Sequence, residues 1–437
     1  MKRNALINLV KWKQKNDRKP LIIKGARQVG KTWLMKEFAR LEYKYCAYIN
    51  FESSPHLKNL FIANYDINRI LMAISIEVGF NPTEQDTLIV LDEIQEAEGA
   101  LTSLKYFYEN APQYHIMAAG SLLGVILGSK TSFPVGKVDF LELYPLTFTE
   151  FLEATNDQPL VQVLHLFDWS TVELFKTKLV ERLKQYYFVG GMPEAVQTFV
   201  NGFDIKKIRE VHQNLLNAYE QDFSKHAPHS IVPRIRMLWH SIPAQLAKEN
   251  RKFIYGLIKK GARAKEYEEA INWLIDCGLL LKVYQVNKPA LPLKAYEDLK
   301  SFKLYMLDVG LLGAMAGLDA KTLLLGNKLF TEFKGAITEQ FVLQQLLPQK
   351  IESINYWSAQ NARAEVDFLL QWQGKVIPVE VKSEENLQAK SLRVYQDKFS
   401  PSISIRVSMT NYRKQSILIN LPLYAVNNLT QLIDAKE

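Results

Sequence analysis

The sequence has little cysteine and no long uninterrupted apolar run. Only two of its 437 residues are cysteine, Cys46 and Cys277, which excludes a disulfide scaffold and a Cys-rich zinc cluster. No segment approaches the ~18 consecutive apolar residues that a membrane-spanning helix requires. Near the start, the apolar run of residues 5–10 is interrupted by Lys11 and is too short for a signal peptide. We therefore expect a cytoplasmic protein without a membrane partner.

Repeats, low-complexity tracts and an extreme charge are also absent. Hydrophobic residues make up 48% of the chain and charged residues 23%, a mixture typical of globular proteins rather than disordered ones. The 54 basic residues outnumber the 46 acidic ones, which gives a formal charge of +8 and is compatible with a polyanionic partner. At ~150 residues per domain, the length predicts about three domains.

The first third of the chain alternates between strand-like and helix-like patterns. Short apolar runs occur at residues 21–23, 45–51, 87–91, 115–119 and 138–143, and helical patterns lie between them, for example at 32–41 and 100–109. Strands separated by helices predict an α/β fold, a parallel sheet covered on both faces.

A glycine-rich motif, Gly-x4-Gly-Lys-Thr, occupies residues 25–32 between a predicted strand and a predicted helix. Gly25 and Gly30 permit backbone conformations that a Cβ would block, so that main-chain N–H groups can surround a phosphate. Lys31 would place its charge on the β and γ phosphates, and Thr32 would offer its hydroxyl to Mg²⁺. The alternative is a glycine-rich turn with a solvated lysine. The predicted nucleotide-binding residues here are Gly25, Ala26, Arg27, Gln28, Val29, Gly30, Lys31, Thr32 and Trp33.

Acidic residues end a second apolar strand run, at Asp92 and Glu93. Ligands bind at the carboxyl ends of strands in open parallel sheets, so Asp92 would join Thr32 in the Mg²⁺ shell. Glu93 would act as the general base that deprotonates the attacking water. Ser121, after a third strand, is a candidate contact to the γ-phosphate, although small polar residues are common in any turn. The pattern predicts ATP and Mg²⁺ as cofactors.

These motifs resemble those of a large prokaryotic AAA-type P-loop ATPase family whose members carry a carboxy-terminal region of unassigned function. The resemblance rests on residues 20–32, 91–95, 119–121, 144–151, 190–194 and 302–312, and so extends over nearly the whole chain. It implies ATP binding and carries no information about biological role.

One departure from the family concerns the positions Gly136 and Lys137, where members commonly show Gly-Arg. Lysine keeps the charge but lacks the bidentate fork of arginine. If this position acts on the γ-phosphate, hydrolysis is weakened or another arginine serves, with Arg27 and Arg182 as candidates. The sequence leaves open whether the protein forms a homo-oligomer. An ATP-binding switch or scaffold without significant turnover is therefore the alternative function.

The middle of the chain is rich in basic residues. Residues 231–265 contain nine Lys and Arg residues against one acid and precede a helical pattern and a strand. This order resembles a winged helix, and its basic segment could contact DNA or RNA phosphates. The helix that would read the bases carries four acidic residues, which repel a phosphate backbone: Glu266, Glu268, Glu269 and Asp276. A protein-contact module or a spacer is the alternative.

The last region contains paired carboxylates on two predicted strands. Glu380 and Lys382 share one face of their strand, and a turn at Gly374 brings Asp367 close to them. Two carboxylates can hold Mg²⁺ and an ammonium can steer water, with Glu339 as a third carboxylate. The arrangement resembles the metal site of restriction-endonuclease-like folds, although alternating Val-Glu-Val-Lys is also typical of a half-exposed strand. We predict Asp367, Glu380 and Lys382 as catalytic, and Glu339, Asp367 and Glu380 as metal ligands.

The sequence therefore predicts four modules. They are an AAA-type P-loop ATPase core at 1–150, a helical lid at 151–228, a winged-helix-like module at 229–295 and a restriction-endonuclease-like α/β domain at 296–437. The functional hypothesis is a P-loop ATPase that binds and hydrolyses Mg·ATP and is coupled to a nucleic-acid-facing carboxy-terminal module. Nuclease activity in that module is a separate hypothesis.

Overall fold

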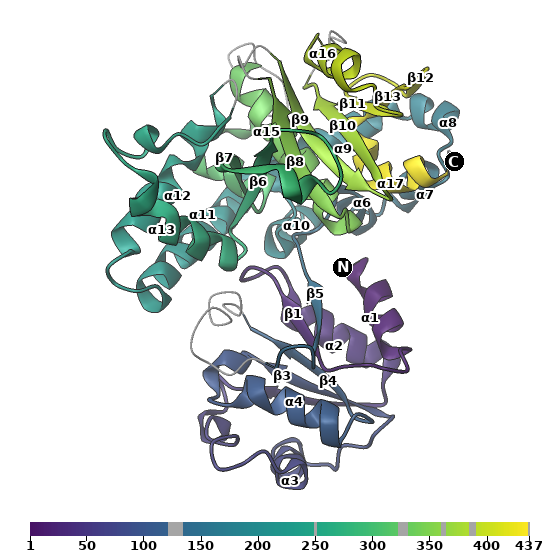
Figure 1. The fold of residues 1–437 in the computed structure, drawn as a ribbon. Coiled ribbons are helices and arrows are strands. Elements are labelled where there is room, and N and C mark those ends of the chain that lie inside the picture. The colour runs from purple at the N-terminus through teal and green to yellow at the C-terminus, as the bar shows by residue number, and fades with distance from the viewer. Residues whose placement is uncertain (121–133, 249–250, 322–330, 360–363, 384–389, 436–437) are drawn as a thin grey trace. The chain divides into compact units, whose positions relative to one another are not determined.

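The structure, a computed structural model, describes the chain except for residues 121–133, 249–250, 322–330, 360–363, 384–389 and 436–437. The described residues form two compact units (Figure 1). The amino-terminal unit contains residues 2–144 and the short segment 276–279, and the carboxy-terminal unit contains residues 145–275 and those from 280 onward. Among the described helices, none is long and apolar enough to cross a membrane.

The amino-terminal unit contains a five-stranded sheet in the order β2-β3-β4-β1-β5, in which every pair of neighbours is parallel. Its strands are β1 (Leu21–Lys24), β2 (Tyr45–Asn50), β3 (Thr87–Asp92), β4 (His115–Ala119) and β5 (Asp139–Glu142). Each strand lies within or overlaps a predicted apolar run. The predicted α/β fold with a parallel sheet is therefore confirmed for this unit.

The helices of this unit pack on the sheet because each exposes an apolar stripe. They are α1 (Ala5–Lys13), α2 (Lys31–Glu42), α3 (Ile67–Val78) and α4 (Ala100–Asn110), with 3₁₀ turns η1 (Pro55–Leu57) and η2 (Ile94–Glu96). Side chains of α3 and α4 share one hydrophobic cluster with Ile49, Ile89 and Ile116 of the strands. Every residue of β3 is buried, as expected for a central parallel strand covered on both faces.

The carboxy-terminal unit begins with a run of helices. These are α6 (Phe148–Ala154), α7 (Gln158–His165), α8 (Trp169–Leu174), α9 (Lys176–Val189), α10 (Pro193–Val200), α11 (Ile205–His226), α12 (Val232–Leu246), η3 (Tyr255–Leu257) and α13 (Ala264–Asp276). The later helical elements are η4 (Leu293–Tyr296), α14 (Val309–Met315), α15 (Thr331–Leu346), η7 (Leu347–Gln349), α16 (Lys390–Phe399), η8 (Leu423–Asn428) and α17 (Leu429–Asp434).

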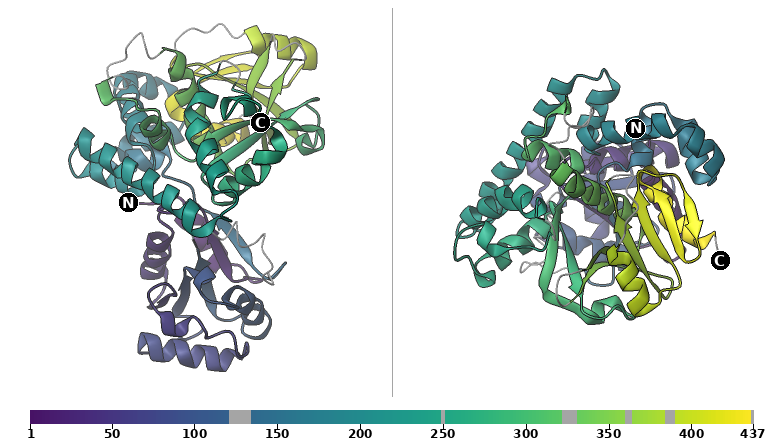
Figure 2. Two further views of the ribbon diagram at one scale, coloured as in Figure 1. Left: turned by 90° about the vertical axis from the view of Figure 1, so that its left-hand side faces the viewer. Right: turned by 90° about the horizontal axis from the view of Figure 1, so that it is seen from above.

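One eight-stranded mixed sheet organises this unit, in the order β12-β13-β11-β10-β9-β8-β6-β7. Its strands are β6 (Leu280–Val286), β7 (Glu297–Met306), β8 (Ser353–Ser358), β9 (Glu365–Trp372), β10 (Lys375–Val381), β11 (Ser404–Ser408), β12 (Arg413–Gln415) and β13 (Leu418–Pro422). Strands β8, β9 and β10 form an antiparallel meander, and β11 returns after α16 to lie parallel to β10. Figure 2 shows the strands continuing from green to yellow across this sheet.

The sheet crosses one of the predicted module boundaries. Strands β6 and β7 form an antiparallel hairpin, and β6 also pairs with β8 at Gln285 and Tyr356. The hairpin assigned in part to the winged-helix-like module is therefore an edge of the same sheet as the last region. The boundary at 150/151 falls within α6, and that at 295/296 falls within η4. The finer division of the carboxy-terminal unit stays a prediction.

Two motifs of the family resemblance meet at a buried carboxylate, Asp308. Its oxygens accept hydrogen bonds from the main-chain N–H of Gly191 at 2.6 Å and of Leu311 at 3.0 Å. A Cβ on Gly190 would lie 2.1 Å from Asp308 Oδ1, so this position has room only for glycine. Burial raises the pKa of Asp308 above its ordinary value. These residues join the α9–α10 junction to α14, which is a structural role.

Candidate functional site

The loop between β1 and α2 has the conformation that its glycines predict. Gly25 has φ 144° and Gly30 has φ 96°, both in the range that favours glycine, and Gln28 also has a positive φ of 63°. A Cβ on Gly25 would lie 2.3 Å from the carbonyl oxygen of Leu143. Helix α2 then begins at Lys31, so its free N–H groups and dipole face the loop.

Lys31 folds back over this loop. Its ammonium donates to the carbonyl oxygens of Gly25 at 2.9 Å and Ala26 at 2.8 Å. The residue is 7% exposed, and burial lowers the pKa of Lys31 to about 8. Its two hydrogen-bond partners are neutral, so among the described residues this buried cation has no carboxylate bonded to it. Phosphate oxygens are stronger acceptors for such a group than carbonyls are.

Thr32 and Asp92, from separate predicted motifs, meet directly. The hydroxyl of Thr32 donates to Asp92 Oδ2 at 2.6 Å, and Asp92 is 2% exposed. The hydroxyl of Tyr48 donates to the same oxygen at 2.9 Å. Burial is the main cause that raises the pKa of Tyr48, to about 12. Tyr48 was not predicted from the sequence, because a tyrosine in an apolar strand run is indistinguishable from a core residue.

Glu93 follows Asp92 at the end of β3 and has φ 49°, an uncommon value for a residue with a Cβ. The main-chain N–H of Glu93 donates to Asp92 Oδ1 at 3.1 Å, and Gln95 Nε2 donates to Glu93 Oε2 at 2.6 Å. Strands β1, β4 and β3 are parallel neighbours, so their carboxyl ends lie at the same end of the sheet. Both acids therefore lie at the end of the sheet from which the Gly25 loop emerges.

The remaining predicted nucleotide contacts differ in what they can offer. Ala26 and Val29 are buried and can contribute only main-chain groups, whereas Trp33 is 40% exposed. Ser121 lies outside the described residues. Arg3, which was not predicted, is buried and donates to the carbonyl oxygens of Val29 at 2.9 Å and Tyr144 at 2.6 Å. Arg3 is far from Val29 and Tyr144 in the sequence, so no local pattern indicates these contacts.

Lys137, at the position where the family commonly shows arginine, precedes β5. Strands β1 and β5 are parallel with Leu21 opposite Asp139, so Lys137 lies at the opposite end of the sheet from the Gly25 loop. Its ammonium pairs with Glu109 Oε1 at 3.1 Å. Arg182, one of the alternative candidates, belongs to the other unit and pairs with Asp157 there. Lys137 therefore does not face the loop of its own amino-terminal unit.

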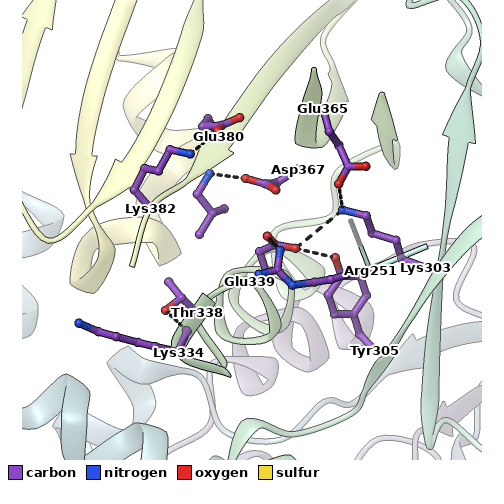
Figure 3. Close-up of polar contacts among 11 residues, drawn as sticks. Arg251, Lys303, Tyr305, Lys334, Thr338, Glu339, Glu365, Asp367, Glu380 and Lys382 are labelled. Atoms are coloured by element: carbon purple, nitrogen blue, oxygen red, sulfur yellow. Dashed lines mark hydrogen bonds and ion pairs between the residues drawn. The ribbon is translucent and has the colours of Figure 1, made fainter. Parts of the chain in front are cut away.

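The carboxy-terminal unit contains a second group of charged side chains, on β9 and β10 (Figure 3). Phe368 pairs with Val379, and the same register places Asp367 opposite Glu380. Asp367 Oδ2 accepts the main-chain N–H of Val381 at 2.7 Å, and Lys382 pairs with Glu380 Oε1 at 2.7 Å. The structure therefore brings together Asp367, Glu380 and Lys382.

Glu380 is the least well compensated member of this group. It is 3% exposed, and its Oε2 is buried without a hydrogen-bond partner among the described residues. Burial, followed by the neighbouring Asp367 carboxylate, raises the pKa of Glu380 to about 7. A buried orphan oxygen beside a second carboxylate fits a cation, so Asp367 and Glu380 are suitable Mg²⁺ ligands.

Glu339, the third predicted metal ligand, has other partners. Its carboxylate forms an ion pair with Arg251, accepts a hydrogen bond from Tyr305 at 3.1 Å and lies 3.8 Å from Lys303. Lys303 is fully buried and pairs with Glu365 at 2.6 Å (Figure 3). Burial alone would lower the pKa of Lys303, but its acidic surroundings raise it overall.

No three His, Cys, Asp or Glu side chains in the described part of the chain are grouped closely enough to hold a metal ion. The three-carboxylate set of Glu339, Asp367 and Glu380 is therefore not assembled in this structure, and the metal assignment stays a prediction. The neighbours of Glu339 were not predicted from the sequence, because the spacing of Arg251, Lys303 and Tyr305 to Glu339 in the chain carries no motif.

Comparison with known protein families assigns three successive regions. Residues 17–152 match the model of an AAA domain. The amino-terminal unit is a P-loop ATPase-like domain. Residues 180–322 match a domain of unknown function (DUF8612), and residues 334–425 match another domain of unknown function (DUF4143). Neither description mentions a winged helix or a nuclease. No curated protein matches the chain.

Three solved structures that match the chain resemble it only distantly. A Walker-type ATPase of Pyrococcus abyssi is 14% identical, with a TM-score of 0.43, and the match covers 72% of this chain and 95% of that one. The Orc1 protein of Aeropyrum pernix in complex with DNA is 10% identical, with a TM-score of 0.28 and coverages of 72% and 93%. Cdc6p of Pyrobaculum aerophilum is 11% identical, with a TM-score of 0.24 and coverages of 73% and 91%. At such scores these likenesses support no argument about function.

Proposed function

We propose that the amino-terminal unit binds Mg·ATP at residues 25–32 and hydrolyses it. The observation that carries the proposal is the 2.6 Å contact between Thr32 and Asp92, beside the buried ammonium of Lys31. A hydroxyl and a carboxylate at this separation are suitable for one Mg²⁺ shell, next to a cation for the phosphates. The match of residues 17–152 to an AAA domain supports the same assignment.

Each residue would have a distinct role in the reaction. The main-chain N–H groups of the loop and the ammonium of Lys31 would bind the phosphates. Thr32 and Asp92 would hold Mg²⁺, which when bound offsets the charge on the β and γ phosphates. Glu93 would take a proton from water as the water oxygen attacks the γ-phosphorus and the bond to the ADP oxygen breaks.

The test separates nucleotide binding from turnover. We expect Lys31→Ala to weaken ATP binding by at least about 100-fold, because a desolvated charge–phosphate contact is lost. We expect Glu93→Gln to retain binding and to lose about 100- to 10,000-fold in kcat, the range for removal of a general base. Lys44→Ala, at an exposed lysine beside β2, is the matched control. Wild-type turnover in Glu93→Gln would reject the catalytic role of that residue.

The competing function is an ATP-binding switch or scaffold without significant turnover. The orientation of Lys137, paired with Glu109 away from the loop, favours it, because Arg27 is then the one named candidate that the described amino-terminal unit leaves for the transition state. Wild-type turnover no faster than that of Glu93→Gln, together with intact ATP binding, would favour the switch. A rise in turnover with protein concentration would instead support a homo-oligomer in which a neighbour supplies the missing cation.

A second proposal concerns the carboxy-terminal unit, which we propose contacts nucleic acid and cleaves phosphodiester bonds. The convergence of Asp367, Glu380 and Lys382 supports it, and so does the order of α15, the β8–β10 meander, α16 and β11. Asp367 and Glu380 would hold Mg²⁺, and Lys382 would orient the attacking water. The exposed basic residues Lys252, Lys259, Lys260, Arg263 and Lys265 would contact phosphates.

Incubation of plasmid DNA and of RNA with Mg²⁺ tests this second proposal. We expect Asp367→Ala to reduce cleavage by at least about 100-fold, since one of two metal-binding carboxylates is lost. Asp397→Ala, an exposed aspartate on α16, is the control. Indistinguishable cleavage rates in wild type and Asp367→Ala would remove the nuclease assignment. Binding that persists without cleavage, and that weakens in Lys259→Glu, would leave a nucleic-acid-binding module coupled to the ATPase.

A further inference from the structure

Gln95 lies on a short, firmly anchored turn directly after the predicted general base. The 3₁₀ turn η2 begins immediately after Glu93, with the main-chain N–H of Glu96 donating to the carbonyl oxygen of Glu93 at 2.9 Å. Ile94 is completely buried in the core beneath α3 and α4, which fixes the turn to the sheet. The side chain of Gln95 therefore projects from a rigid base, two residues from Glu93.

The two polar atoms of the Gln95 amide differ in their hydrogen bonding. Nε2 donates to Glu93 Oε2 at 2.6 Å. Within the described part of the chain, Gln95 Oε1 is buried and accepts no hydrogen bond. A buried acceptor without a partner costs stability, so an apolar side chain of the same length would be at least as good for folding. Stability therefore does not explain an amide at this position, whereas its hydrogen bond to Glu93 does.

We propose that Gln95 is a positioning residue for Glu93 in ATP hydrolysis. This inference rests on the proposed function of the amino-terminal unit. A carboxylate held at one oxygen by a fixed N–H has its other oxygen fixed in direction, which a general base requires.

The decisive variants keep the length of the side chain and remove the donor. In Gln95→Met we expect kcat to fall about 10- to 100-fold while KM for ATP changes less than about 2-fold, because the proposed role of Gln95 is to position Glu93 and not to bind ATP. We expect Tm to be unchanged or higher, because the buried unpaired oxygen is gone. Gln95→Glu, which replaces the donor with a second carboxylate, should lose as much turnover or more.

A matched control and a double-mutant cycle exclude a general structural effect. Gln113 also donates to a glutamate of the same unit, Glu84, at 3.2 Å on the surface, so Gln113→Met should behave as wild type. In the Glu93→Gln background, Gln95→Met should cause no further loss of turnover, because it acts only through Glu93.

The outcomes distinguish failure of this inference from failure of the proposed function. Wild-type kcat in Gln95→Met, with Glu93→Gln inactive, would overturn the role of Gln95 and leave the ATPase assignment intact. An equal loss from Gln95→Met in both backgrounds, with a lower Tm, would also overturn it, since that is the signature of a structural residue. Wild-type turnover in Glu93→Gln would instead reject the proposed general base itself.

Discussion

The predicted nucleotide site and the larger set of charged side chains shown in Figure 3 are assembled in opposite ways. The first is made from one contiguous loop and the end of one strand, and main-chain groups form much of it. The second is made from side chains of β7, α15, β9, β10 and the segment around Arg251, which are far apart in the sequence. A site made of contiguous backbone leaves a motif, whereas a site assembled from scattered side chains leaves only fragments of one.

Two buried lysines show the same contrast. Lys31 is hydrogen-bonded to carbonyl oxygens, and burial lowers its pKa to about 8. Lys303 is bonded to Glu365, and although burial lowers its pKa, the charge interactions with Tyr305, Glu365 and Asp367 raise that pKa overall. Lys31 is therefore a buried cation bonded to neutral groups in the described part of the chain, and Lys303 is one bonded to a carboxylate. This contrast supports the proposed phosphate-binding role of Lys31 and a structural role for Lys303.

The largest effect is expected at Gly25, where the backbone of the nucleotide site is most constrained. In Gly25→Ala the new Cβ would meet Leu143 O at 2.3 Å in a φ 144° conformation, so the loop has to move. We expect ATP affinity to fall by more than about 100-fold, since misplaced main-chain donors no longer converge on the phosphates. Gly202→Ala is the matched control, because Gly202 has φ 145° and a Cβ added there would meet nothing within 4 Å. Nucleotide titration measures the affinity of both variants. Equal affinities would contradict the claim that main-chain groups of the Gly25 loop form the site.

The second-largest effect is expected at Lys303, among the charged side chains shown in Figure 3. Lys303→Met leaves the carboxylate of Glu365 largely buried without its cation, and we expect a loss of about 3–5 kcal/mol in the free energy of unfolding of the carboxy-terminal unit. ATP binding by the amino-terminal unit should be unchanged. Lys300→Met, at an exposed residue of the same strand, is the control. Urea unfolding followed together with nucleotide binding measures both quantities, and a Lys303→Met variant as stable as the control would show that the ion pairs are dispensable.

Sequence reasoning succeeded where local spacing determines structure. The strands of the amino-terminal sheet and the Gly25 loop follow from apolar runs and glycine positions, and Asp367, Glu380 and Lys382 meet because strand alternation and one turn fix them. It could not find Tyr48, Arg3 or Lys303, whose contacts depend on how distant elements pack. The pairing between β6 and β8 is also invisible in a local pattern, and the division of this unit into modules stays a prediction.

Two buried histidines, one in each unit, predict how stability depends on pH. Burial lowers the pKa of His115 on β4 to about 4 and that of His212 on α11 to about 3. In the unfolded chain histidine titrates near ~6.5, so below that pH the unfolded state binds more protons and stability is lost as pH falls. Each group contributes a slope of at most about 1.4 kcal/mol per pH unit, from ~6.5 down to its folded pKa.

Substitutions assign this slope to a unit. His115→Asn retains an acceptor for the hydroxyl of Tyr43, which lies 2.6 Å from His115 Nδ1, but cannot titrate. We expect it to flatten the pH dependence of the amino-terminal unit alone, and His212→Asn to do so for the carboxy-terminal unit alone. His165→Asn, at an exposed site, is the control. Unfolding midpoints between about pH 5 and 7 give the slopes, and a slope unchanged in both buried variants would rule out these residues as its source.

The smallest expected effect tests whether the predicted helical lid and the last region are one structural unit. Trp169 of α8 stacks on Tyr412 with ring centroids 4.2 Å apart and planes 6° apart, although the two residues are far apart in the sequence. We expect a coupling of about 0.5–1.5 kcal/mol between Trp169→Ala and Tyr412→Ala in a double-mutant cycle, the range for stacked aromatic pairs. Phe167→Ala, a neighbour whose ring contacts Trp169 instead, should couple to Tyr412→Ala more weakly. A cycle without coupling would contradict this prediction. The separate modules predicted from the sequence would then describe the carboxy-terminal unit better than a single structural unit does.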